Sequence, residues 1–138
     1  MDIKQISVFL ENNAGRLAKV TRTMADAGAS IRAISIADTA DFGILRVIVD
    51  RPETAMKALV DAGFTARMTD VLAVEIPDVP GALARVMELF QETEVNIEYL
   101  YASLEGDRDK AVVIFKVQDV EHGRRIVREK GLAVLDEF

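Results

Sequence analysis

The chain of 138 residues contains no cysteine, only three prolines and a single histidine. Without cysteine there is no disulfide framework, no thiolate zinc site and no cysteine nucleophile. No apolar run approaches the roughly 20 residues needed to cross a bilayer, and the N-terminus lacks the basic start and long apolar stretch of a signal peptide. We therefore expect a cytoplasmic protein without a membrane partner.

Acidic side chains outnumber basic ones by 23 to 17, which gives a formal net charge of −6. The excess lies in the second half of the chain, where the acidic side chains outnumber the basic ones, while the two kinds balance in the first half. A phosphate backbone would be repelled by such a surface. The charge therefore disfavours a nucleic-acid partner.

The sequence repeats itself. The stretch "ENNAGRLAKV" at 11–20 returns as "PDVPGALARV" at 77–86, so that Gly15 corresponds to Gly81, 66 positions later. Further along the chain the offset becomes 68, and Gly63 then corresponds to Gly131. We expect two domains, 1–69 and 70–138, joined only by "MTDV".

Each repeat has the same order of predicted elements. An alternating apolar segment predicts a strand, and apolar residues at helical spacing follow the glycine. Two further strands, a second helix that ends at a glycine and a short final strand complete the unit. The order βαββαβ, twice, predicts an α+β fold of two ferredoxin-like units packed side by side. Each unit has an antiparallel sheet with its helices on one face.

No catalytic constellation is evident in the sequence. The one histidine, His122, has no second ligand nearby and is expected to lie exposed on a helix surface. The carboxylates of "EGDRDK" and "REK" are typical of solvated turns and helix ends. We expect no catalytic residues, no metal site, no cofactor and no enzyme activity.

The glycine loops are candidates for a binding site. They place free backbone N–H groups at a helix N-terminus, where an anion such as a carboxylate is favoured. Asp78 could accept a hydrogen bond from an ammonium group, and Asn12 stands at the same place in the first repeat. These features suit a free amino acid. The alternative is purely structural: Asn13 and Asp78 are good N-cap residues.

The glycine loops, the segments "GASI" and "EVNI" that return from helix to strand, and the doubled βαββαβ order resemble a tandem pair of ACT domains. This module regulates amino-acid metabolism by binding small molecules. The resemblance covers nearly the whole chain and leaves no room for a catalytic domain. The chain is therefore similar to the stand-alone two-domain ACT proteins.

The resemblance implies that a ligand contacts the strand-to-helix loop of one domain and the helix-to-strand return of its neighbour. The positions implied are Asn12, Asn13, Ala14, Gly15, Arg16, Leu17, Ser30 and Ile31, and Asp78, Val79, Pro80, Gly81, Ala82, Leu83, Asn96 and Ile97. The first loop has Ala14 where the family usually has proline, and Ser30 where it often has asparagine. From Asp78, Pro80 and Asn96 we expect the second loop to bind more tightly.

The expected function is that of a non-enzymatic regulatory protein that senses an amino acid and acts on an enzyme of amino-acid metabolism. One alternative is a scaffold or assembly subunit with the same fold and no ligand. A small enzyme would need clustered polar groups on the sheet, which are not seen. An RNA-recognition motif could use Tyr99 and Tyr101, but the first repeat offers Ala33 and Ser35 at these positions.

We also expect a homodimer. Strand alternation turns a second set of side chains away from the helices. These are Ser7, Ala33, Ser35, Ile44 and Ile48 in the first repeat, and Ala73, Tyr99, Tyr101, Val112 and Ile114 in the second. The set is small or apolar, and contiguous apolar surface usually marks an interface.

Overall fold

The computed structural model describes residues 3–11, 13–38, 41–104 and 109–138. The chain separates into two compact units, which we call the first unit (Lys4–Thr69) and the second unit (Asp70–Phe138, with Ile3). The first unit contains β1 (Ile3–Glu11), α1 (Arg16–Asp26), β2 (Ile31–Asp38), β3 (Phe42–Val49), α2 (Pro52–Asp61) and the start of β4 (Thr65–Pro77). The second contains the rest of β4, then α3 (Ala82–Glu92), β5 (Ile97–Ala102), β6 (Lys110–Val117), α4 (Val120–Glu129) and β7 (Ala133–Leu135).

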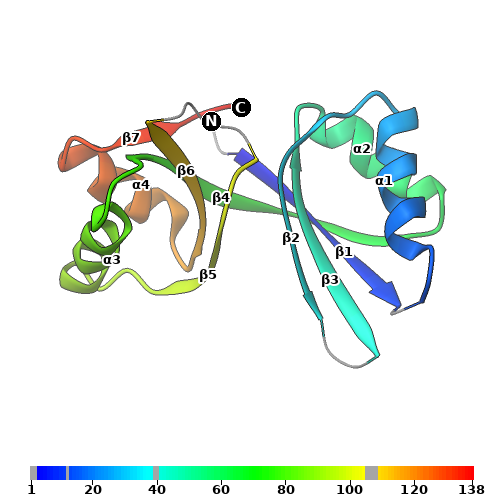
Figure 1. The fold of residues 1–138 in the computed structure, drawn as a ribbon, viewed down its shortest axis with the longest axis horizontal. Helices are drawn as coiled ribbons and strands as arrows, with labels where there is room; N and C mark the ends of the chain where they lie inside the picture. Colours follow the sequence, from blue (N-terminus) through cyan, green and yellow to red (C-terminus); the bar gives the residue numbers. More distant parts are fainter. Residues whose placement is uncertain (1–2, 12, 39–40, 105–108) are drawn as a thin grey trace. The chain divides into compact units, whose positions relative to one another are not determined.

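The strands of each unit follow the ferredoxin-like order. In the first unit the order is β2-β3-β1-β4, and in the second β5-β6-β4 continues to β7, which pairs with β4. Within each unit both helices lie on the same side of the strands (Figure 1). The predicted α+β class and the βαββαβ order of both repeats are therefore confirmed.

The expected link between the repeats was wrong in one respect. The segment "MTDV" is not a connection between two strands but lies inside β4, which runs unbroken from Thr65 to Pro77. The segment contains no glycine or proline, and Thr69 and Val71 are β-branched residues that favour extended backbone. One strand therefore ends the first unit and begins the second.

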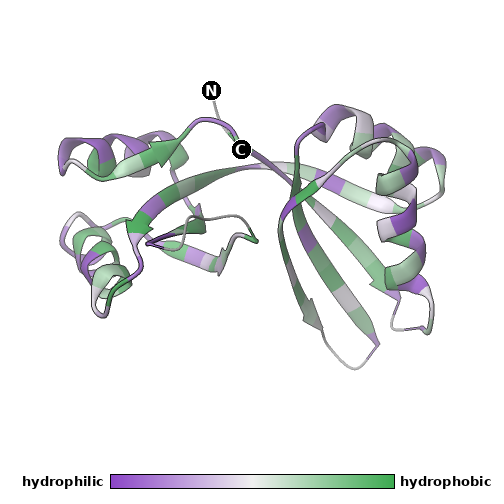
Figure 2. Cartoon of the chain, turned by 45° about the horizontal axis from the view of Figure 1, so that its top comes forward, coloured by the Kyte–Doolittle hydropathy of each residue, from purple (hydrophilic) through white to green (hydrophobic). Residues whose placement is uncertain are grey.

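Each unit has its own core between sheet and helices. In the first, Ile6, Val8 and Leu45 pack with helix residues such as Val20 and Met24. In the second, Phe90 of α3 meets Phe115 of β6 edge-on, with ring centroids 5.3 Å apart. Figure 2 shows the corresponding pattern, with apolar strands and helices that carry polar residues on their outer sides.

The side chains expected to face away from the helices belong to neither of these two cores. Our expectation that this set is exposed was nevertheless wrong at several positions, because strand alternation determines which face a side chain is on and not whether that face is covered. The buried members of the set are Ala33, Ile48, Ala73, Tyr101, Val112 and Ile114.

Candidate functional site

In both units the first helix starts directly after a glycine in the left-handed conformation. Gly15 has φ 85° and ψ −9°, and Gly81 has φ 89° and ψ −9°. A Cβ atom built on either glycine would meet nothing within 4 Å, so the backbone conformation, and not crowding, requires glycine here. The two loops therefore have the same backbone geometry and open space beside it.

No side chain caps either helix. The N-cap residues are Gly15 and Gly81 themselves, and neither helix start receives a side-chain hydrogen bond. The Nδ2 group of Asn13 donates instead to Oε2 of Glu11, at 3.0 Å. The structural alternative, in which Asn13 and Asp78 serve as caps, was therefore wrong, because the glycines occupy the capping positions.

Each helix start leaves backbone donors without a protein acceptor. The first helical hydrogen bond of α1 runs from the N–H of Lys19 to the carbonyl of Gly15, at 2.9 Å. The N–H groups of Leu17 and Ala18, before it, have no acceptor among the described residues. Such donors, together with the positive end of the helix dipole, favour a negative charge at this place. The same holds in the second unit for Leu83 and Ala84, where Arg85 N–H donates to Gly81 at 3.0 Å.

A hollow of about 290 Å³ lies beside the first glycine loop. It combines one cationic, one carboxylate and one amide side chain with apolar side chains from two strands and the helix start. Its volume is close to the lower end of the range for small-molecule pockets. The residues that line it are Leu10, Glu11, Asn13, Arg16, Leu17, Ile36 and Gly43.

An aromatic ring holds the cationic side chains at this end of α1. The guanidinium carbon of Arg16 lies 4.8 Å from the centroid of the Phe64 ring, and Nζ of Lys19 lies 5.7 Å from it. The Nε atom of Arg16 is buried and has no hydrogen-bond partner. Stacking on an aromatic face limits the freedom of an arginine. Arg16 is thus held beside the hollow by contacts within its own unit.

The return from helix to strand differs between the two units. In the first, the N–H of Ser30 donates to Oδ1 of Asp50 at 2.8 Å, and the same carboxylate lies 3.9 Å from Arg32. Both units share a backbone bond at this place, from the N–H of Asp50 to the carbonyl of Ser30 at 3.1 Å and from the N–H of Gln118 to the carbonyl of Asn96 at 3.3 Å, so the carboxylate contact is what the second unit lacks. The backbone donor of Ser30 is therefore already occupied by a carboxylate of its own unit.

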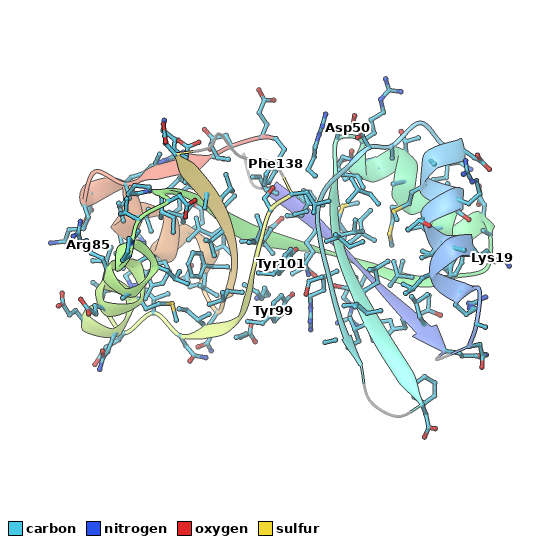
Figure 3. The ribbon with its side chains drawn as sticks, in the orientation of Figure 1. Lys19, Asp50, Arg85, Tyr99, Tyr101 and Phe138 are labelled. Carbon is cyan, nitrogen blue, oxygen red and sulfur yellow. The ribbon has the colours of Figure 1, made fainter. Side chains whose placement is uncertain are left out.

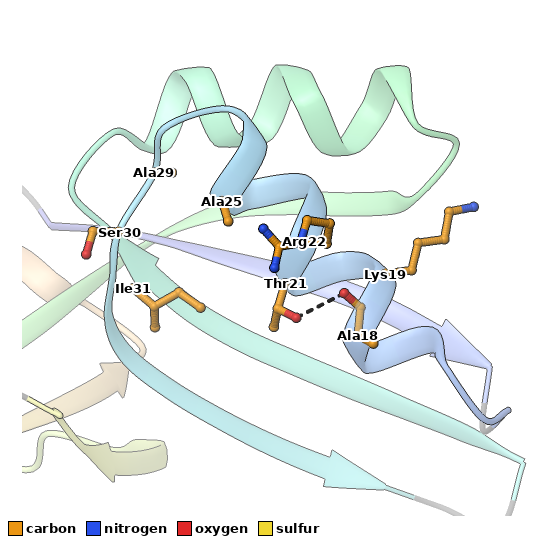
Figure 4. Close-up of a pocket in the computed structure, with 8 residues that line it drawn as sticks. All are labelled: Ala18, Lys19, Thr21, Arg22, Ala25, Ala29, Ser30 and Ile31. Atoms are coloured by element: carbon orange, nitrogen blue, oxygen red, sulfur yellow. Dashed lines mark hydrogen bonds between the residues drawn. The ribbon is translucent and has the colours of Figure 1, made fainter.

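Within one unit the loop and the return do not meet. They lie at opposite ends of α1, whose 11 residues span roughly 16 Å. Figure 4 shows Ser30 at the far end of the helix from Lys19, and Figure 3 shows Asp50 toward that same end of α1. A second, open hollow extends along α1 between these two ends, and it is lined by Ala18, Lys19, Thr21, Arg22, Ala25, Ala29, Ser30 and Ile31.

The residues implied by the resemblance are mostly at the surface. Arg16, Ile31 and Ile97 are half-buried and Ala82 is buried, whereas Asn12 lies outside the described residues. The exposed ones are Asn13, Ala14, Gly15, Leu17, Ser30, Asp78, Val79, Pro80, Gly81, Leu83 and Asn96.

Sequence reasoning missed several residues of the first hollow: Leu10, Glu11, Ile36 and Gly43. It also missed Phe64, which lies behind Arg16. An isolated glycine inside a strand often marks a close approach, so Gly43 carried a signal that could have been used.

Other kinds of site have little support. Among the described residues no group of three or more His, Cys, Asp or Glu side chains could hold a metal ion. His122 is half-buried, not exposed as expected. It lies in the first turn of α4, where its backbone N–H donates to the capping carboxylate of Asp119. In the part of the chain that is described, no helix is long and apolar enough to cross a membrane.

Comparisons with known proteins place this geometry in context. A family model described as the ACT domain pair matches residues 1–138. A crystal structure of a protein from Bacteroides thetaiotaomicron is 40% identical, with a TM-score of 0.92 over 98% of this chain and 92% of that one. The ligand-free regulatory subunit of aspartate kinase from Thermus thermophilus is 22% identical, with a TM-score of 0.69 over 94% and 93% of the two chains. At 22% identity, the similarity to this regulatory subunit shows a shared fold. No curated protein matches the chain.

Proposed function

The chain belongs to the ACT domain pair family, and from this premise we propose that it is a non-enzymatic regulatory protein that binds a free amino acid at its glycine loops. One observation carries the proposal. Both α1 and α3 begin at a left-handed glycine without a side-chain cap, and each leaves two backbone N–H groups without an acceptor among the described residues. A helix start of this kind stabilises the carboxylate of a ligand.

Regulation requires that the ligand distinguishes two states of the protein. An amino acid shifts an equilibrium only by the difference between its affinities for the two states. The states differ in assembly or in the binding of a partner. The fold likeness to a regulatory subunit of aspartate kinase supports an enzyme of amino-acid metabolism as that partner. The proposal places the protein in the cytoplasm.

A homodimer is part of the proposal, since closed twofold dimers are the commonest assemblies. Several apolar residues that the sequence assigns to its interface are buried. Light scattering at micromolar concentration should give twice the 15.2 kDa mass of one chain. A strictly monomeric mass, with and without amino acids, would contradict this part of the proposal.

A thermal-shift screen of the twenty amino acids tests the proposed function. A ligand that binds only the folded state at a hundredfold excess over its Kd adds about 2.7 kcal/mol to the free energy of unfolding. We expect a rise in Tm with one amino acid or a small chemically related group. If none of the twenty raises Tm, the alternative of a scaffold with vacant loops is favoured.

A further inference from the structure

The two glycine loops share their backbone geometry but not their chemical surroundings. Both glycines have nearly the same φ and ψ, and each precedes a helix start with two free N–H groups. The side chains around them differ at every polar position of the first hollow. Where the first unit has Glu11, Asn13 and Arg16, the second has Pro77, Val79 and Ala82, and Leu132 stands in place of Phe64.

The first hollow contains one fixed positive group and one negative group. Arg16 adds a full charge to the partial charge of the free N–H groups at the start of α1, and it forms no ion pair with any described residue. Glu11, at the end of β1, supplies a carboxylate of which one oxygen, Oε2, accepts from Asn13. The arrangement can therefore bind a carboxylate at Arg16 and an ammonium group at Glu11.

The rest of the hollow is apolar. Leu10 is buried, while Leu17 and Ile36 are 48% and 49% exposed and can cover a ligand. Gly43 lies opposite Leu10 in the pairing of β1 with β3, where a Cβ would lie 3.7 Å from Cδ1 of Ile36. These groups carry no charge, and they face the part of an amino acid that is neither its carboxylate nor its ammonium group. An amino acid with an apolar side chain therefore fits best there.

We infer that the hollow beside Gly15 selects a zwitterionic amino acid with an apolar side chain, and that the equivalent place in the second unit does not. The inference rests on the proposed function and names the ligand class of the same site. The sequence features Asp78 and Pro80 predict that the second loop binds the ligand more tightly than the first, and this inference reverses that order. Arg16 and Glu11 are its specificity-determining residues.

Calorimetric titration of the whole chain tests the inference, with leucine, aspartate and lysine as probes. Leucine should bind with one site per chain, and more tightly than aspartate or lysine. Leucinamide lacks the carboxylate and N-acetylleucine lacks the ammonium group. Each should bind at least about tenfold more weakly than leucine, because each loses one charged hydrogen bond.

Two variants probe the residues directly. Arg16→Ala introduces the residue that the second unit carries, and Glu11→Gln keeps shape while removing charge. Each should weaken leucine binding at least about tenfold. Arg22→Ala removes a cation from the same helix that is paired with Asp26 at 3.7 Å, and should leave the affinity unchanged. If Arg16→Ala is poorly folded by its melting curve, Glu11→Gln alone decides.

The outcomes separate the inference from the proposed function. Tight binding of aspartate or lysine, or leucine binding that survives both variants, overturns the inference while the protein remains an amino-acid sensor. Two equal sites per chain also overturn it. If no amino acid binds in the screen, the proposed function fails and the inference fails with it.

Discussion

The guanidinium group of Arg16 stacks on the ring of Phe64, 4.8 Å from its centroid, and so a residue that follows α2 positions a residue at the start of α1. Phe64→Leu would reproduce the second unit, where Leu132 stands. We expect it to lower the free energy of unfolding by about 1 to 2 kcal/mol, through lost packing and lost cation–π attraction. Leucine affinity should fall severalfold, because Arg16 loses its support.

Chemical denaturation and calorimetric titration of Phe64→Leu measure the two effects. Leu59→Val, in the same core but not part of the cation–π contact, is the matched control. It should cost similar stability without changing leucine affinity. An equal loss of affinity in both variants would show that general loosening of the core, and not the stacking of Arg16, is responsible.

The left-handed glycines give a second prediction. Gly15→Ala and Gly81→Ala should each destabilise the protein by about 1 kcal/mol, because φ values of 85° and 89° are unfavourable for any residue with a Cβ. The two losses should be alike, since neither new methyl group meets a neighbour. Only Gly15→Ala should also weaken leucine binding. Melting curves and titrations of both variants check this, and equal losses of affinity would contradict a single site.

The fold could be predicted from the sequence because its signals are local and occur twice. Alternation marked the strands, and the glycine at the start of each first helix was correctly recognised. The role of that glycine was harder to see. Asn13 looked like a cap, but a cap depends on the backbone angles of Gly15, which put the glycine itself at the N-cap position.

The first hollow could not be predicted because its walls come from strands that meet only through pairing. The register places Leu10 opposite Gly43, and Ile36 opposite Leu45 on the neighbouring strand. Periodicity gives the faces of these strands but not their register. The position of Arg16 over Phe64 likewise depends on how two helices pack, which no local pattern encodes.

A strained residue in the second unit gives a third prediction. Glu94 has φ 58°, whereas Gly28, at the same place in the first unit, has φ 79°. A side chain with a Cβ costs roughly 1 kcal/mol in this region. Glu94→Gly should therefore stabilise the protein by up to about 1 kcal/mol in urea denaturation, and Glu94→Ala, which keeps the Cβ, should not. A destabilising Glu94→Gly would show that the strain is relieved by other contacts.

The helix-to-strand connection at Ser30, in the first unit, gives a fourth prediction. Asp50 accepts from the N–H of Ser30 at 2.8 Å and lies near Arg32. Asp50→Ala should cost about 1 kcal/mol, and Asp50→Asn, which retains an acceptor oxygen, should cost less. Gln118→Ala, at the same place in the second unit, should be nearly neutral because only its backbone N–H donates there. Equal losses in the free energy of unfolding for Asp50→Ala and Gln118→Ala would show that the Asp50 carboxylate does not stabilise this segment.

The last prediction decides between the two loops. Asp78 is exposed, its backbone N–H donates to the carbonyl of Asp109 at 2.8 Å, and its side chain caps no helix. Asp78→Asn should therefore leave the melting temperature of the ligand-free protein unchanged. If the first hollow is the principal site, leucine affinity should also stay the same, because Asp78 is not among the residues that line it.

The opposite expectation, that Asp78 binds the ammonium group of the ligand in the second loop, predicts a loss of roughly 1.5 to 3 kcal/mol in the binding free energy of Asp78→Asn. Titration of the wild type, Asp78→Asn and Glu11→Gln with leucine separates the two expectations, since each carboxylate belongs to a different unit. A loss in Asp78→Asn with none in Glu11→Gln would place the ligand at Gly81. The reverse result would place it at Gly15, where Arg16 and the free N–H groups of Leu17 and Ala18 meet the carboxylate.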